Sequence, residues 1–241
     1  MTAPTQACEA VDTLVLWDID GTLISTGPAA AAIYPQAFRA LTGRPARHTV
    51  DIQGRTELDT MSELFARHGL AEPLEDLVCD ALTAALRSRV MELRAGGRVL
   101  SGAVETLNWF ARTPGILQTV LTGNLRVNAE LKLRTFGLAE LIDLDIGGYG
   151  CDHRVRSRLV GVARRRSANR AFTGRRTVLI GDTVRDVQAA LDNGLRVVAV
   201  ATGPTGAAEL LLAGADVVLS DLTDPTAVLA AVRGDDREPP L

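Results

Sequence analysis

The sequence predicts an α/β fold, in which helices cover both faces of a parallel sheet and an all-helical segment is inserted after the first strand. Short apolar runs, typical of strands buried on both faces, alternate with helical patterns along most of the 241 residues. The alternation stops between residues 27 and 98, where helix formers dominate and no buried strand is apparent. We therefore interpret residues 11–26 and 99–233 as the core, residues 27–98 as a helical cap, and residues 1–10 and 234–241 as flexible ends.

Six apolar runs are the expected strands of the core, and helical patterns separate most of them. In the pattern over residues 185–194, Val187, Ala190 and Leu191 share one face, and Gly194 is a candidate left-handed C-cap. Because helices lie between the strands, we expect the strands to be parallel. The expected strands are residues 11–19, 116–123, 141–148, 176–182, 195–203 and 215–222, and further helices are expected at 126–138 and 205–214.

The expected cap consists of helices alone. Residues 29–43 form its first helix, and residues 72–97 form one or two helices at its end. The helix between them spans residues 56–70 and begins with Thr56 and Asp59, a T-x-x-D capping pattern. A helical lid of this kind, placed over a sheet edge, excludes water and macromolecules from a site beneath it.

Composition and charge argue against several classes of protein. The chain has a net charge of −3 and a pI of about 5.7, so it lacks the basic excess that nucleic-acid binding favours. No apolar run approaches the roughly 18 residues of a membrane span, and the first ten residues do not resemble a secretory signal. Three cysteines, Cys8, Cys79 and Cys151, are far apart and are expected to be free thiols. We therefore expect a cytoplasmic protein without nucleic-acid or membrane partners.

Acidic residues follow two of the expected strands. In "LVLWDIDGTLI", Asp18 and Asp20 end an apolar strand and, being two apart, point to the same side. In "GDTVRD", Asp182 and Asp186 are four apart at the start of a helix. The carboxyl ends of parallel strands meet at one edge of a sheet, and two like charges about 4 Å apart repel by roughly 4 kcal/mol at an intermediate dielectric. The sequence therefore predicts that Mg²⁺, a cation with oxygen ligands, neutralises these carboxylates.

A third motif, "LTGN", ends another expected strand and suits an anion. Thr122 offers a hydroxyl donor, and Gly123 and Asn124 precede a helix whose free N–H groups are expected to point at the site. A bound cation and an anion cradle beside a carboxylate nucleophile describe phosphoryl transfer to aspartate.

The motifs "DIDGT", "LTGN" and "GDTVRD", in that order along the chain, resemble the haloacid dehalogenase superfamily, in its phosphatase branch with a helical C1-type cap, as in phosphoglycolate-phosphatase-like proteins. The resemblance covers roughly residues 12–232. It implies a Rossmann-like core, Asp18 as a nucleophile that forms an aspartyl-phosphate, and Asp20 as general acid and then general base. It also implies Mg²⁺ held by Asp18, the backbone carbonyl of Asp20 and Asp182, with Asp186 close by or bridging through water. An aspartate at position 20 is similar to the phosphatase form, since dephosphorylation needs that base.

One departure from this family concerns the lysine that usually holds the nucleophile and the phosphate. No lysine lies at that position, just before the strand that carries Asp182, but "GGYGCDHRVRSRL" resembles a subgroup with arginine there, and we favour Arg156 over Arg154 and Arg158. Lys132, the single lysine of the chain, is the rival. It lies about two helical turns past the "LTGN" motif, roughly 12 Å along the helix axis, which we judge too far to bridge.

These features together predict a Mg²⁺-dependent hydrolase of a small phosphorylated metabolite. Arg55, in "IQGRT", either reaches from the cap to the substrate or lies on the surface of a turn. One alternative is a sugar-phosphate mutase of the same superfamily, to whose cap element "GRT" is a partial match. Another is a non-catalytic phosphate-binding relative, which the missing lysine suggests. The substrate and the oligomeric state are not predicted.

Overall fold

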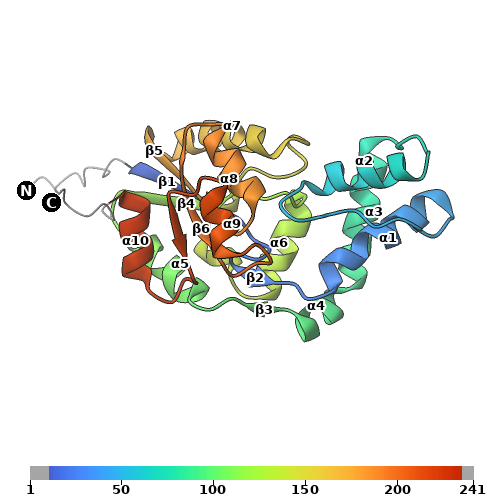
Figure 1. The fold of residues 1–241 in the computed structure, drawn as a ribbon, viewed down its shortest axis with the longest axis horizontal. Coiled ribbons are helices and arrows are strands. Elements are labelled where there is room, and N and C mark those ends of the chain that lie inside the picture. Colours follow the sequence, from blue (N-terminus) through green and yellow to red (C-terminus); the bar gives the residue numbers. More distant parts are fainter. Residues whose placement is uncertain (1–10, 235–241) are drawn as a thin grey trace, which may run out of the picture.

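A computed structural model describes residues 11–234, which form an α/β core joined to a helical cap (Figure 1). The core holds a five-stranded sheet of order β4-β1-β5-β6-β7, in which all neighbouring strands are parallel. The α/β fold class with a parallel sheet is thus confirmed. The predicted flexible ends and Cys8, except for Gly234, lie outside the described residues. The strands are β1 (Val11–Trp17), β4 (Ile116–Val120), β5 (Phe172–Gly181), β6 (Arg196–Val200) and β7 (Val217–Leu219).

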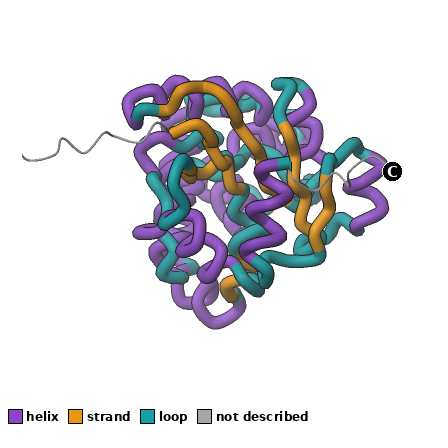
Figure 2. Tube along the Cα trace, turned by 90° about the vertical axis from the view of Figure 1, so that its left-hand side faces the viewer, coloured by secondary structure: helices purple, strands orange, loops and turns teal. Residues whose placement is uncertain are grey.

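Helices cover both faces of the sheet because its strands are apolar on both sides (Figure 2). In β1, Leu14 and Leu16 belong to one apolar cluster, Val15 and Trp17 belong to the other, and all four are fully buried. On the Trp17 side pack α5 (Ala103–Ala111), α6 (Arg126–Thr135) and α10 (Pro225–Arg233), and on the Leu14 side pack α7 (Arg156–Ser167), α8 (Val184–Leu191) and α9 (Ala207–Leu212).

The strand predicted at residues 141–148 is wrong. Two short 3₁₀ helices, Ala139–Leu141 and Leu144–Ile146, occupy this segment, and its pairing with the sheet is a bridge between Gly148 and Leu121. The apolar side chains pack against the sheet from the side, with Ile142 in the same cluster as Trp17. Hydropathy does not separate this arrangement from a buried strand, because both need a short apolar run.

The cap is helical and has an apolar cluster of its own, which includes Phe38 and Phe65 with their rings 5.1 Å apart. The N-cap predicted for the second helix of this domain is present, since Thr56 Oγ1 accepts a hydrogen bond from the Asp59 N–H at 3.1 Å. Two short antiparallel strands, β2 (Ile24–Ser25) and β3 (Arg98–Val99), pair where the chain leaves and re-enters the core. No helix described in the cap or the core is both long and apolar enough to span a bilayer. The cap helices are α1 (Ala29–Thr42), α2 (Glu57–Arg67), α3 (Glu75–Ser88) and α4 (Val90–Gly96).

Candidate active site

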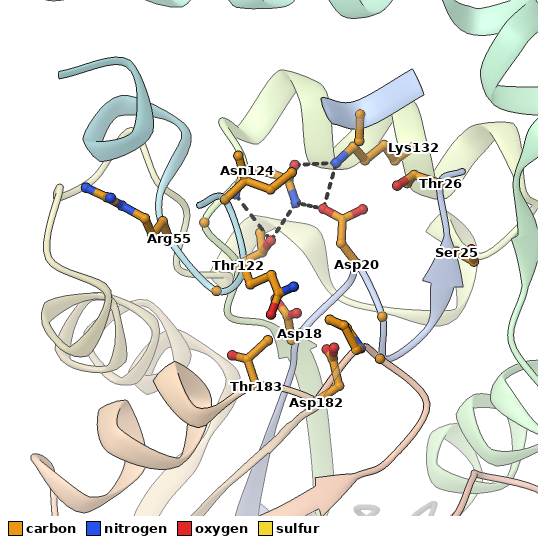
Figure 3. Close-up of a pocket in the computed structure, with 18 of the residues that line it drawn as sticks. Asp18, Asp20, Ser25, Thr26, Arg55, Thr122, Asn124, Lys132, Asp182 and Thr183 are labelled. Atoms are coloured by element: carbon orange, nitrogen blue, oxygen red, sulfur yellow. Dashed lines mark hydrogen bonds and ion pairs between the residues drawn. The ribbon is translucent and has the colours of Figure 1, made fainter. Parts of the chain in front are cut away.

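Acidic side chains from distant parts of the chain meet beyond the carboxyl ends of two neighbouring strands. Asp18 follows β1 and Asp182 follows β5 (Figure 3). Asp186 lies in the first turn of α8. Each offers one carboxylate oxygen, and these oxygens lie within 4.8 Å of one another. All three residues are buried. The clustering follows from the pairing of β1 with β5, which brings the ends of these strands together.

The cluster is electrostatically incomplete without a cation. Burial raises the pKa of Asp182 to about 9, and the charges of Asp18 and Asp186 act in the same direction. Burial also raises the pKa of Asp18 to about 7, although the Arg156 guanidinium opposes it. A hard cation with oxygen ligands relieves this repulsion, so the cluster fits Mg²⁺. Asp18 and Asp182 belong to this cluster, and their role as Mg²⁺ ligands together with the backbone carbonyl of Asp20 stays a prediction.

Two glycines let the backbone approach Asp182. A Cβ atom would lie 2.2 Å from Asp182 Oδ2 if it were added to Gly21, and 1.7 Å if it were added to Gly203. Gly21 also has a φ of +91°, a conformation that other residues rarely adopt. Its neighbour Thr22 donates a hydrogen bond to Asp182 Oδ1 at 3.0 Å. Gly21 and Thr22, which follow β1, therefore position Asp182 of the "GDTVRD" motif.

Arg156 occupies the position for which the sequence offers no lysine. Its Nη2 donates a hydrogen bond to Asp18 Oδ1 at 2.6 Å and lies 2.5 Å from Asp186 Oδ1. Its side chain is 7% exposed, so both ion pairs are shielded from water. Arg154 instead forms an ion pair with Glu72, and Arg158 is exposed on α7. The structure thus brings Arg156 to the predicted nucleophile.

Asp186 is held by protein groups on both of its oxygens. Oδ2 accepts hydrogen bonds from the Thr183 N–H at 3.1 Å and from Thr183 Oγ1 at 2.6 Å, which completes a capping box at the start of α8. Oδ1 faces Arg156. These contacts make Asp186 a support for Arg156 and for α8, and its role as a metal ligand stays a prediction.

The "LTGN" residues form a chain of hydrogen bonds that ends at Lys132 (Figure 3). Asn124 Nδ2 donates to Thr122 Oγ1 at 2.7 Å and to Asp20 Oδ2 at 2.8 Å. Lys132 Nζ donates to Asp20 Oδ2 and to Asn124 Oδ1, both at 2.6 Å. The judgement that Lys132 is too far from the site is therefore wrong. The estimate of roughly 12 Å counted only the distance along the axis of α6 between Asn124 and Lys132. The Lys132 side chain instead meets Asp20, which lies beside the helix.

Glu57, at the start of α2, is a site residue that the sequence reasoning missed. Its N–H donates to the Gly123 carbonyl at 2.8 Å, and its Oε2 accepts from the Leu125 N–H at 3.1 Å and from Asn128 Nδ2 at 2.8 Å. An amide that we expected to be free for an anion, that of Leu125, is thus occupied by the cap. The side chain is buried, and burial raises the pKa of Glu57 to about 7. An acidic residue after a helix cap is common, and nothing in the sequence distinguished this one.

Arg55 lies in the wall of the same cavity, but its guanidinium is engaged within α2. Its Nε is 2.7 Å from Asp59 Oδ2, and its Nη1 pairs with Glu63. Figure 3 shows the side chain pointing away from Asp18 and Asp182. The structure therefore does not bring Arg55 to the aspartate cluster.

The site opens into a cavity of about 380 Å³ between the cap and the core. This volume lies near the lower end of small-molecule pockets, which span roughly 300–1,000 Å³. The core contributes its aspartates, Thr122, Lys132 and Arg156, and the cap contributes Tyr34 and Glu57.

The comparisons with known proteins agree with this geometry. The haloacid dehalogenase-like hydrolase family matches residues 13–194, most of the chain, and the chain belongs to this family. None of the curated proteins compared with the chain matches it.

Solved structures of similar fold include CbbY from Rhodobacter sphaeroides in complex with phosphate, with a TM-score of 0.69 and 20% identity over 92% of this chain and 99% of that chain. A hydrolase from Pseudomonas syringae has a TM-score of 0.69 and 19% identity over 92% and 99% of the two chains. A predicted phosphoglycolate phosphatase from Haemophilus somnus has a TM-score of 0.65 and 18% identity over 90% and 98%. At these identities the comparisons show a common fold.

Proposed function

We propose that this protein is a Mg²⁺-dependent phosphomonoester hydrolase that acts on a small phosphorylated metabolite through an aspartyl-phosphate. The observation that carries the proposal is the buried cluster of Asp18, Asp182 and Asp186, which holds Arg156 and opens into the cavity. In the first step, an Asp18 oxygen attacks phosphorus, and the bond to the substrate oxygen breaks. The leaving alcohol takes a proton from Asp20. In the second step, Asp20 takes a proton from water, which attacks phosphorus and releases inorganic phosphate and free Asp18.

The surrounding groups have distinct roles in this proposal. Arg156 orients Asp18 and balances charge on the phosphoryl group, for which a planar guanidinium is well suited. The Thr122 hydroxyl accepts from Asn124 and keeps its own hydrogen for a phosphate oxygen. Lys132 and Asn124 hold Asp20 on the side of the leaving group. Mg²⁺, when bound, offsets the negative charge of the cluster and of the phosphate.

Two further observations support a small substrate. The cavity lies between the cap and the core, and its volume of about 380 Å³ suits a metabolite. CbbY, which shares the fold, was solved with phosphate.

The free thiols of Cys79 and Cys151 are compatible with the reducing cytoplasm in which we place the activity.

The proposal is tested by measuring phosphate release from a panel of phosphorylated metabolites with Mg²⁺ and with EDTA. We expect release with Mg²⁺ alone, and we expect Asp18→Asn to abolish it while circular dichroism shows an intact fold. Equal rates with Mg²⁺ and EDTA, or undiminished release by Asp18→Asn, would contradict the mechanism.

The two alternatives have less support. For a mutase, Arg55 would be expected to reach the substrate, but its guanidinium pairs with Asp59 and Glu63. The motive for a non-catalytic relative was the missing lysine, and Arg156 contacts Asp18 in its place. Incubation with a hexose 1-phosphate and a sugar bisphosphate decides between hydrolase and mutase, because a mutase yields the isomer without net phosphate release.

A further inference from the structure

We propose that Glu57 of the cap selects a leaving group bearing a hydroxyl, so that the substrate is the phosphate monoester of a polyhydroxylated, neutral alcohol. This inference rests on the proposed function, because Glu57 lines the same cavity as Asp18. It adds a substrate class, and it assigns the choice of that class to one cap residue.

The first observation is a set of buried acceptor atoms without donors. Glu57 uses Oε2 for the Leu125 and Asn128 hydrogen bonds, while its Oε1 is buried and has no hydrogen-bond partner among the described residues. Asp20 Oδ1 and Asn128 Oδ1 are in the same condition. Glu57 and Asn128 are 2% and 0% exposed, so bulk water does not satisfy them. Asp20 and Glu57 line the cavity, whereas Asn128 lies behind Glu57 and bonds its Oε2. Because leaving a buried acceptor unpaired is costly, the Glu57 end of the cavity favours a ligand that donates hydrogen bonds.

The second observation is the local charge balance. The carboxylates of Asp20 and Glu57 lie near the one ammonium of Lys132, which bonds Asp20 at 2.6 Å and, through its charge, lowers the pKa of Glu57 against the larger effect of burial. Above the raised pKa of Glu57, a carboxylate on the leaving group would meet the like charge of Glu57 at this end. A second ammonium would meet Lys132. A neutral hydroxyl donates a hydrogen bond without either repulsion.

The other cationic groups of the cavity do not reverse this preference. Arg55 is paired with two carboxylates of α2, Asp59 and Glu63. Arg98 is exposed on β3, where water and salt weaken its attraction for an anion.

The position of Glu57 is well defined, as a selective contact requires. Its N–H bonds the Gly123 carbonyl, and its Oε2 bonds two groups at the start of α6. The oxygen left for a ligand is therefore held in place by contacts to the core, and a substrate hydroxyl need not order the side chain.

The experiment measures affinities of phosphomonoesters for Asp18→Asn protein, in which turnover is blocked, by calorimetry with Mg²⁺. The probes are glycerol 3-phosphate, propyl phosphate, phosphoglycolate and phosphoethanolamine, which carry hydroxyl, no polar group, carboxylate and ammonium. We expect glycerol 3-phosphate to bind about tenfold to a hundredfold more tightly than propyl phosphate, as for hydrogen bonds to a charged acceptor. We expect the other two probes to bind no better than propyl phosphate.

Glu57→Gln in the same background tests the residue. Its oxygen can keep the Leu125 N–H while its amide presents donors to the cavity, so the glycerol 3-phosphate preference should fall at least about fivefold and phosphoglycolate should gain. Glu92→Gln, the same change on an exposed cap helix, should alter none of these ratios.

The outcomes separate this inference from the proposed function. A glycerol 3-phosphate to propyl phosphate ratio near one, or a ratio that Glu57→Gln leaves unchanged, overturns the role of Glu57 even if wild-type protein releases phosphate. Absence of Mg²⁺-dependent hydrolysis in the wild type overturns the proposed function, while the affinity ratios still report on Glu57. If phosphoethanolamine bound most tightly, the preferred group of the substrate would be an ammonium and not a hydroxyl, which would contradict the inference.

Discussion

The two ends of the cavity are built differently. At the Asp18 end, the side chains come from the ends of β1 and β5 and from the first turns of α7 and α8, and Arg156 holds Asp18 and Asp186 together. At the Glu57 end, a cap helix meets α6, and Lys132 is the cation. The first end is formed by core residues, with one bond from Arg156 to the Gly54 carbonyl of the cap at 3.4 Å. At the second end, Glu57 joins the core residues Lys132 and Asp20 only while cap and core are in contact. The comparison indicates that the core supplies the chemistry and that the junction with the cap supplies selectivity.

Several contacts hold this junction together. The Glu57 N–H bonds the Gly123 carbonyl at 2.8 Å, and Thr56 Oγ1 donates to the Arg154 carbonyl at 2.9 Å. Farther out, Arg185 pairs with Asp51 at 2.9 Å. Movement of the cap would break these contacts and separate Glu57 from the start of α6.

The largest expected effect comes from the Asp18 end, with Arg156→Ala. The change leaves Asp18 and Asp186 buried without the cation that pairs with them, so we expect a loss of about 3–5 kcal/mol in the free energy of unfolding. We expect phosphate release to fall at least about a hundredfold, because a preorganised donor is lost. Urea unfolding and phosphate release measure the two effects. Arg158→Ala, an exposed change on the same helix, is the control, and equal behaviour of the two variants would contradict the role of Arg156.

An effect of opposite sign is expected for Asp182→Asn without metal. The pKa of Asp182 is raised from 3.8 to about 9 in the folded protein, and the unfolded chain ionises this group first, so the fold loses stability progressively as the pH rises from about 4 to about 9. Removing the charge should therefore raise the melting temperature in EDTA by about 3 °C or more at about pH 8, and by less at about pH 5. Mg²⁺ should stabilise the wild type and have little effect on the variant. A variant that melts lower than the wild type at pH 8 in EDTA would refute the repulsion.

The smallest expected effect is at the other end, with Lys132→Met. The variant should lose about tenfold in kcat on alkyl phosphates, because Asp20 is no longer held toward the leaving oxygen. Aryl phosphates should lose less, since their leaving groups need little help from an acid. Arg134→Met, an exposed change on the same helix, should match the wild type. An equal loss on both substrate classes would show that Lys132 acts on structure in general and not through Asp20.

Sequence reasoning was strongest where a local pattern has one physical meaning. A parallel α/β sheet follows from apolar runs alternating with helical patterns, and Asp18 and Asp182 follow from motifs that end neighbouring strands. It failed for residues 141–148, because an apolar run also suits side chains packed against a sheet without entering it. It also misjudged Lys132, since a distance along a helix does not say what lies beside the helix.

By itself, the sequence determined which chemistry is available: carboxylates, a hydroxyl and basic side chains at the ends of buried strands, whose spacing sets the face on which each one lies. Only the tertiary structure decided which of these groups contact each other. Arg156 bonds Asp18, Lys132 bonds Asp20, and Glu57 bonds the start of α6. The physical reason is that strand and helix periodicity are local properties of the chain. The contact between a cap and a core depends on how two separately packed bodies fit together, and no periodicity in the sequence records that fit.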